Sequence, residues 1–423
     1  MRFTKFVNFL LVLSITFSLP SCASAQRTQN GRAASRLAIR AARMLDVNSG
    51  QLITDPVILI EGERITAVGP RLSIPQGTKI IDLGDSTILP GLIDAHTHIT
   101  YHFDETGHFG LSGDATPEVT LKYATENARN TIEGGVTTIR NLGASQRVDL
   151  RLRDAINRGE VVGPRIIASG EPLMAYDLRD ASNQAERTAQ IRSFIRARVA
   201  EGVNVIKIFE GVDDRGSPVF SRTDIHVAVE EARRAGLKVA VHAHEAAAIK
   251  AAVEGGCDSI EHGTFLDDEA IKLMVKHHTA LVPTLYLPTH YLEHRSQFVF
   301  DNSTWDFFER LRSHNLENLR RAKRAGVLIV SGSDAVAGLH GHNVREIEWL
   351  VKAGLSPQEA IHAATIDAAK LLGMEDKIGE IKEGKLADLI SVAGDPLRDI
   401  RSLEQVQFVM KSGQVVKAKA GSQ

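Results

Sequence analysis

The stretch KVAVHAHEAAAIKAAVEGGCDSIEH at residues 238–262 decides the fold class of this chain. It begins with an apolar run at 238–244 and ends with a second at 258–262, each of strand length. Between the two runs, residues 247–256 form a segment of helix length rich in alanine and other apolar residues. A strand, a helix and a second strand in this order predict a βαβ unit with two parallel strands.

The same alternation runs through the middle of the chain, residues 91–377. Six more apolar runs raise the number of expected strands to eight, and they lie at 92–98, 137–140, 165–168, 204–208, 279–283 and 327–331. Most neighbouring runs are separated by helix-length segments. The pattern predicts the α/β class and a (β/α)8 TIM barrel. An open, doubly wound sheet is the alternative, but no glycine-rich phosphate loop supports it.

The segments near the two ends of the chain are both rich in short apolar runs typical of strands. VILI at 57–60 and ITAV at 65–68 flank a short turn, which is typical of a hairpin. Short apolar runs with tight turns recur near the C-terminus. We therefore expect one composite β-sandwich domain built from residues 36–90 and 378–423.

Residues 1–25 have the features of a signal peptide. Arg2 and Lys5 precede an apolar run at 6–19, and the small residues at 23–25 offer a cleavage site. The run is shorter than the roughly 20 residues that span a bilayer, so we expect no membrane-spanning segment. A buried helix is the alternative. The expected protein is exported, either periplasmic or secreted.

The two cysteines and the net charge bear on lipid attachment, disulfide bonds and binding partners. Cys22 ends a sequence that resembles a lipoprotein cleavage box, so a lipid anchor is an alternative to a soluble form. Cys257 would then be the only cysteine left, and no internal disulfide is expected. The net charge of −2 gives no reason to expect nucleic acid as a partner. We expect a small-molecule substrate; the oligomeric state stays open, and a homo-oligomer is one possibility.

Metal-ligating residue types stand at the ends of the expected strands. His96 and His98 close the first strand with both side chains on one side, in phase with Asp94. His242, His262 and Asp334 end three later strands. Each alone has an ordinary explanation, such as a hydrogen-bonded pair or a helix cap. Because the carboxyl ends of barrel strands meet at one face, their joint occurrence predicts a metal centre there.

Lys207 lies inside the apolar run NVIKI at 204–208. Burying an isolated ammonium group is costly, and burial lowers a lysine pKa. A neutral amine can take up CO2 to form a carbamate, whose two oxygens can bridge two metal ions. The alternative is that the side chain reaches solvent at the strand end.

These motifs together resemble the amidohydrolase superfamily. The resemblance rests on LPGLIDA before HTH, the in-strand lysine, HAH, SIEHGT and GSDA. It is greatest to the imidazolonepropionase-like branch with a bridging carboxylated lysine, which includes prolidase-type dipeptidases and ochratoxin-type amidases. The resemblance implies two divalent ions, for which Zn²⁺ suits the nitrogen and oxygen donors. It implies six ligands: His96, His98 and Asp334 on one ion, His242 and His262 on the other, and carboxylated Lys207 bridging.

The resemblance also implies a mechanism. A metal-bound hydroxide attacks the amide carbon, and Asp334 passes a proton to the leaving nitrogen. His244 holds the substrate carbonyl or the developing oxyanion. Only the family pattern selects His242 rather than His244 as a ligand.

The expected reaction is hydrolysis of the amide C–N bond of a dipeptide, including Xaa-Pro dipeptides, or of an N-acyl amino acid. Alternatives are a cyclic amide hydrolase or deaminase like imidazolonepropionase, a lactonase or esterase, and a non-catalytic binding relative. Loops after the strands set substrate choice in barrels. In these loops we expect substrate contacts from Tyr101, Tyr286 and His340. A substrate that ends in a carboxylate would need a cation near the site, for which Arg140 and Arg179 are candidates.

Overall fold

The structure is a computed structural model that describes residues 36–103, 106–110 and 115–418. The predicted signal peptide and Cys22 lie outside the described residues, so export and lipid attachment stay predictions. The described residues, from Arg36 onward, belong to one compact unit. The predicted domain boundaries at 90/91 and 377/378 therefore also stay predictions.

Parallel strands form the central part of this unit, in two sheets. One sheet has the order β12-β11-β8 and the other β13-β14-β15-β16. Their bounds are β8 Leu92–Thr97, β11 Val136–Asn141, β12 Arg165–Ala168, β13 Val205–Phe209, β14 Lys238–Glu245, β15 Ser259–Phe265 and β16 Ala280–Val282. Seven of the eight expected strands are therefore confirmed.

The stretch at 238–262 folds as predicted. Strands β14 and β15 pair in parallel, with Val241 opposite Ile260. Helix α5, Ala246–Gly255, connects them and buries Ile249 and Val253 in the main core. The helix ends at Gly256, whose φ of +95° lies in the left-handed region that glycine adopts readily.

The eighth expected strand, 327–331, is not a regular strand. The segment makes one isolated bridge, from Ile329 to Leu281, and a second isolated bridge joins Ala335, four residues after the segment, to Thr97. Gly332 packs so closely that an added Cβ would lie 2.3 Å from a side-chain carbon of Val282. The chain then turns at Asp334, where φ is +53°. Because this segment forms no regular ladder and β12 and β13 belong to separate sheets, the fold is TIM-barrel-like, without a continuous closed sheet among the described residues.

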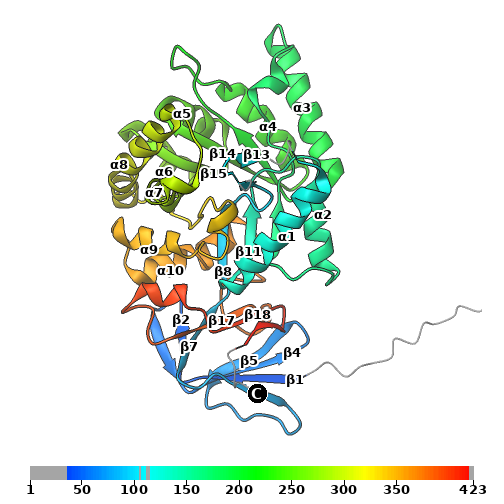
Figure 1. Cartoon of the computed structure of the whole chain (residues 1–423), viewed down its shortest axis with the longest axis vertical. Helices are drawn as coiled ribbons and strands as arrows, with labels where there is room; N and C mark the ends of the chain where they lie inside the picture. The colour runs from blue at the N-terminus through cyan, green and yellow to red at the C-terminus, as the bar shows by residue number, and fades with distance from the viewer. Residues whose placement is uncertain (1–35, 104–105, 111–114, 419–423) are drawn as a thin grey trace, which may run out of the picture. The chain divides into compact units, whose positions relative to one another are not determined.

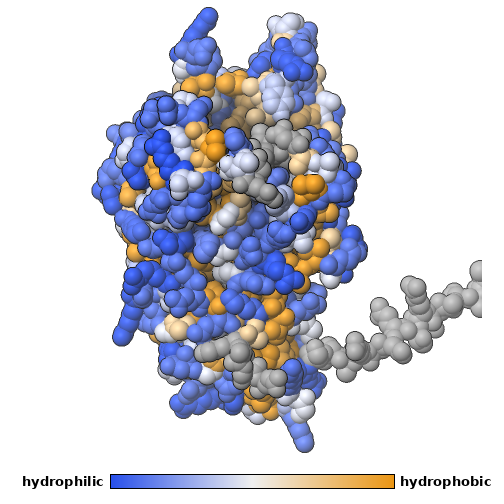
Figure 2. Space-filling model, in the orientation of Figure 1, coloured by the Kyte–Doolittle hydropathy of each residue, from blue (hydrophilic) through white to orange (hydrophobic). Residues whose placement is uncertain are grey.

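Helices surround the parallel strands and bury their apolar faces against them (Figure 1). Hydrophilic residues cover most of the face drawn in Figure 2. None of the described helices has the length and apolarity needed to cross a membrane. The remaining helices are α1 Pro117–Glu133, α2 Val148–Asn157, α3 Gln184–Glu201, α4 Arg222–Arg234, α6 Asp268–His277, α7 Tyr286–Glu293, α8 Asn302–Arg324, α9 Arg345–Lys352, α10 Pro357–Ala363 and α11 Ile366–Leu371.

Strands from both ends of the described chain share a sheet. The order β19-β18-β17-β7-β2-β3 places β17 beside β7, and a second sheet has the order β5-β4-β1-β6. In Figure 1 the blue strands and the red strands accordingly lie together. The expected hairpin is confirmed as β4 and β5. The bounds are β1 Arg36–Arg40, β2 Arg43–Asp46, β3 Gln51–Thr54, β4 Pro56–Glu61, β5 Arg64–Pro70, β6 Lys79–Asp82, β7 Ser86–Pro90, β17 Leu389–Ala393, β18 Phe408–Lys411 and β19 Gln414–Lys417.

An apolar cluster joins these two sheets. Ile39 and Ile58 come from one sheet, Ile88 and Phe408 from the other, and all four side chains are buried. Because this cluster contains residues of both sheets, the strands near the two ends of the described chain share one core.

Substitution Phe408→Ala should lower the free energy of unfolding by about 3–5 kcal/mol, because it leaves a cavity between the two sheets. Urea unfolding of the full chain measures this. The control is Val415→Ala, whose side chain on β19 is 44% exposed, for which we expect a change within about 0.5 kcal/mol. Equal effects of the two substitutions would contradict a shared core.

Candidate metal centre

The strand ends bring His96, His98 and Asp334 together. Oδ1 of Asp334 lies 3.4 Å from Nε2 of His96 and 3.2 Å from Nε2 of His98. The two Nε2 atoms are 3.4 Å apart. Three ligand atoms from one strand and one turn thus converge on a single point, as a divalent ion requires.

Three further histidines form an adjoining group. The ring centroids of His242 and His262 are 4.5 Å apart, and those of His244 and His262 are 4.7 Å apart. Among the described residues, two sets have ligand atoms within 4.8 Å of one another: His242, His244 and His262, and His96, His262 and Asp334. His262 belongs to both sets. The geometry does not choose between His242 and His244 as ligand.

Burial favours the neutral form of four imidazoles, those of His96, His242, His244 and His262, and the neutral form is the one that binds metal. It lowers the pKa of His96 to about 4 and that of His244 to about 4. It lowers the pKa of His242 and of His262 well below the usual value, and neighbouring histidines and Lys207 add to the effect.

Lys207 lies on β13 and is 1% exposed. Burial lowers its pKa to about 8, against the opposing charges of Glu261 and Asp334. Its Nζ has no hydrogen-bond partner among the described residues. Buried polar groups are nearly always paired. This amine therefore calls for a partner that comes from outside the protein. A carbamate bound to metal ions would give it one, so the residues fit the predicted centre.

Glu261 supports the centre and is absent from the predicted set. Its Oε2 accepts a hydrogen bond of 2.8 Å from Nδ1 of His96, and its Oε1 lies 2.8 Å from Nη2 of Arg140. Burial alone would raise the pKa of Glu261, but Arg140 and His96 outweigh it and lower the pKa to about 2. The carboxylate therefore holds the Nδ1 proton and leaves Nε2 of His96 for a metal.

Threonine hydroxyls hold two other rings. Nδ1 of His244 lies 2.9 Å from Oγ1 of Thr264, and Nδ1 of His262 lies 2.7 Å from Oγ1 of Thr284. His262 and Thr284 have φ values of +72° and +48°, which non-glycine residues rarely adopt. Such strain concentrates at functional sites, where the surrounding structure fixes it.

The three expected substrate residues lie in different environments, and their roles stay predictions. The Tyr101 ring stacks on His98 at 4.5 Å between centroids. Tyr286 faces a separate hollow and lies under the guanidinium of Arg345. His340 is buried, with Nδ1 3.0 Å from Oγ1 of Thr131.

Of the two arginines expected at a substrate carboxylate, Arg140 is buried and bound to Glu261, Ser259 and the carbonyl of Ala95. The Arg179 side chain is 73% exposed and lies 4.0 Å from Asp180. Arg140 is therefore committed to the support of the centre.

A cavity of about 300 Å³ opens beside the histidines. Helices α7 and α8 supply its apolar walls, which the sequence alone does not indicate because both helices follow β16 at a distance from the motifs. The lining side chains from these helices are Leu287, Pro288, Tyr291, Phe307, Phe308, Leu311 and Asn315.

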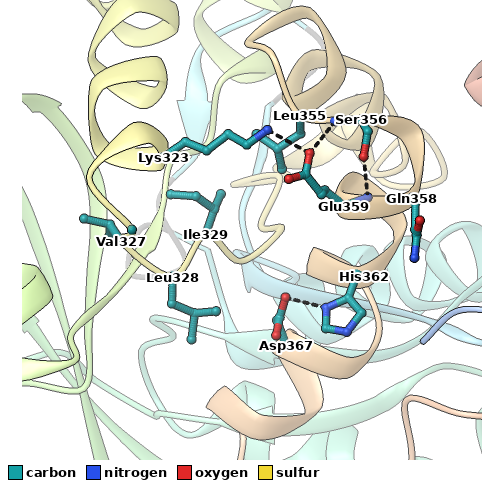
Figure 3. Close-up of a pocket in the computed structure, with 11 residues that line it drawn as sticks. Lys323, Val327, Leu328, Ile329, Leu355, Ser356, Gln358, Glu359, His362 and Asp367 are labelled. Atoms are coloured by element: carbon teal, nitrogen blue, oxygen red, sulfur yellow. Dashed lines mark hydrogen bonds and ion pairs between the residues drawn. The ribbon is translucent and has the colours of Figure 1, made fainter. Parts of the chain in front are cut away.

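A second hollow, of about 620 Å³, lies near the start of the segment that ends at Asp334 (Figure 3). Its charged side chains pair with each other: Lys323 with Glu359 at 2.7 Å and His362 with Asp367 at 2.6 Å. Because catalytic groups of such barrels gather at the carboxyl ends of the strands, we assign this hollow no catalytic role.

Residues 87–416 match the Amidohydrolase family. The chain belongs to this family. It is 28% identical to ochratoxinase from Aspergillus niger over 90% of this chain and 87% of that protein. It is 25% identical to imidazolonepropionase from Pseudomonas paraeruginosa over 84% of this chain and 94% of that protein.

Solved structures give the same result. The chain matches a Xaa-Pro dipeptidase with bound methionine at a TM-score of 0.80 and 33% identity, over 90% of this chain and 99% of that one. It matches a prolidase complexed with N-methylphosphonate-L-proline at a TM-score of 0.82 and 27% identity, over 91% of this chain and 100% of that one. The resemblance to the imidazolonepropionase- and prolidase-like branch is confirmed, and the chain is a hydrolase acting on carbon–nitrogen bonds. The family generally uses divalent metal ions, for which the histidine clusters are suited.

Substitution Glu261→Gln should weaken metal binding by about 10- to 100-fold, because the amide no longer fixes the His96 proton and leaves Arg140 without a counter-charge. Competition with a chelator measures the affinity. The control is Glu230→Gln on α4, whose carboxylate pairs with arginines at the surface. Unchanged affinity in Glu261→Gln would contradict the supporting role of Glu261.

Proposed function

We propose that the chain hydrolyses the amide bond of a dipeptide or N-acyl amino acid, with Xaa-Pro dipeptides as the first substrates to test. The observation that carries the proposal is the buried Lys207 amine, which has no hydrogen-bond partner within the described ranges and lies beside two groups of ligand atoms. Similarity of 33% over 90% of the chain to a Xaa-Pro dipeptidase supports the substrate class.

The proposed centre is binuclear. His96, His98 and Asp334 would hold one divalent ion, and His242 and His262 the other. Carboxylated Lys207 would bridge the two, and Zn²⁺ suits the nitrogen and oxygen donors. When bound, such ions polarise a carbonyl group and lower the pKa of water.

Side chains of the protein would carry out proton transfer, carbonyl binding and the exclusion of water. Asp334 accepts a proton and passes it to the leaving nitrogen, since its buried carboxylate has a lowered pKa and is ionised. Burial alone would raise that pKa, but His96, His98 and Lys207 outweigh it. Nδ1 of His244 lies 2.9 Å from Oγ1 of Thr264; with the hydroxyl donating, the ring would carry its proton on Nε2 and could donate it to the substrate carbonyl. The apolar cavity keeps water away from the reacting bond.

A cyclic amide hydrolase is the second candidate, and the imidazolonepropionase similarity favours it. The bridging role proposed for Lys207 counts against it, because imidazolonepropionase-type enzymes usually work with one metal ion. A lactonase or esterase activity at the same centre is an outcome of the substrate test below.

Substitution Lys207→Ala should remove much of the metal and the activity, because the bridging ligand is lost. Metal analysis should give close to two ions per chain for the unchanged protein. Propionate, whose two oxygens can replace those of the carbamate, should restore part of the activity. The control is Lys250→Ala, whose ammonium pairs with Glu269 at the surface. Full metal content and activity in Lys207→Ala would refute the binuclear centre.

Assays of dipeptides, N-acyl amino acids, cyclic amides, lactones and phosphotriesters with added Zn²⁺ should show turnover of the first two classes. This expected preference for dipeptides and N-acyl amino acids follows from the proposed amide bond and from the enclosed apolar cavity. The measured quantity is kcat/KM for each class. Turnover confined to lactones or phosphotriesters would overturn the proposed bond and leave the metal centre intact.

A further inference from the structure

Two faces of α7 line two separate hollows. Leu287 and Tyr291 line the cavity beside the proposed metal centre, whereas His290 and His294 line a second hollow of about 750 Å³. His342, from the turn that precedes α9, also lines the second hollow. None of the six proposed metal ligands is among the described residues that line it. Three histidines therefore gather at a place where the proposed function gives them no role.

His290 and His294 lie side by side because they are four residues apart on one helical face. The backbone N–H of His294 bonds to the carbonyl of His290 at 3.1 Å, so the helical spacing continues to His294 although α7 ends at Glu293. The centroids of the two rings are 4.6 Å apart. Two imidazoles at this spacing on a helix can bind one metal ion.

The orientation of both rings leaves one nitrogen of each for a ligand. Nδ1 of His294 lies 2.9 Å from the carbonyl oxygen of His290. Since a carbonyl can only accept, Nδ1 carries a proton, and Nε2 of the neutral ring holds the lone pair that a metal requires. Nδ1 of His290 is buried, so Nε2 is the nitrogen of that ring that can face the hollow. Burial and the nearby charges of His294 and His342 lower the pKa of His290 to about 4, so its ring is neutral at physiological pH.

The charges around the second hollow suit a cation. Arg345 is the one lysine or arginine among its described lining residues, and its side chain lies 3.3 Å from Glu348 and 3.4 Å from Glu404. The hollow is also lined by Glu293, the last residue of α7. The carboxylate of Glu293 and the negative end of the helix dipole both favour a positive ion beside the last turn, where two of the histidines lie.

His342 supplies a third imidazole. It is exposed, and it lies near enough for its charge to lower the pKa of His290. The three histidines are not among the described sets whose ligand atoms all lie within 4.8 Å of one another, so the His342 side chain must turn toward the pair on binding. Because that side chain is exposed, this rotation disturbs no core packing.

We propose that His290, His294 and His342 bind one divalent transition-metal ion, with water as the remaining ligand; we call this the outer site. Three imidazoles and one water suit Zn²⁺, which prefers nitrogen and oxygen donors in a tetrahedral arrangement. The outer site should bind more weakly than the proposed centre, because its ligands include no carboxylate and one of them must be reoriented. Purified protein would then keep the two central ions and take up the outer ion only from excess metal. The proposal does not depend on the reaction that the chain catalyses.

Equilibrium dialysis of the full chain, with its centre loaded, against rising free Zn²⁺ tests the proposal. The unchanged protein should take up one ion per chain more than His290→Ala or His294→Ala at the same free Zn²⁺. Loss of one imidazole should weaken binding of the outer ion by about tenfold or more, since removing even an outer partner of a ligand costs that much. His342→Ala should have the same effect. His290→Gln and His294→Gln keep a side chain of similar size, in case the alanine variants disturb α7.

His314→Ala on α8 is the matched control. Nδ1 of His314 lies 2.8 Å from the carbonyl oxygen of Arg310, which is the same contact across four residues. The residue at that spacing is an arginine and offers no second metal ligand. Uptake of the outer ion should therefore match that of the unchanged protein.

Uptake in His290→Ala and His294→Ala equal to that of the unchanged protein, or an equal loss in His314→Ala, would overturn the outer site. Undiminished uptake in His342→Ala would overturn the three-histidine set. Each reading is a difference between a variant and the unchanged protein, so it does not depend on how many ions the centre holds. Failure of the proposed function would therefore leave this result readable.

Discussion

The cost of burying ionisable groups at one point governs this structure. Histidines from three strands, an aspartate and a lysine meet where burial disfavours every charged form. The protein offers Lys207 no hydrogen-bond partner among the described residues and holds Asp334 between two imidazoles. Such a group of donors is unfavourable without a cation, and divalent ions would turn that cost into binding energy.

The residues around the candidate centre set the orientation of its histidine rings. Glu261, Thr264 and Thr284 each hold one Nδ1 atom, which fixes the direction in which the corresponding Nε2 points. Arg140 in turn holds Glu261. The strained backbone of His262 and Asp334 persists because these contacts and the strand ends fix it. The reactive atoms are thus positioned by buried hydrogen bonds from strands, while helices α7 and α8 shape the space for substrate.

The sequence predicted that His96, His98 and Asp334 lie together, as the structure shows, because strand phase is a local property. His96 and His98 are two residues apart, so their shared side follows from strand geometry alone. The prediction of an eighth strand was wrong because a regular strand needs continuous backbone pairing with distant segments, which an apolar run does not encode, and this segment pairs only at Ile329. Glu261 could have been found, since a carboxylate inside a buried strand needs a partner. The cavity could not have been predicted from the sequence, because its walls come from helices whose apolar faces look like ordinary core faces.

Anomalous X-ray scattering from crystals of the metal-loaded protein tests the central claim most directly. We expect two metal peaks, one near His96, His98 and Asp334 and one near His242 and His262, with carbamate density extending from Lys207 between them. A single peak, or an unmodified Lys207 amine that contacts no metal, would contradict it.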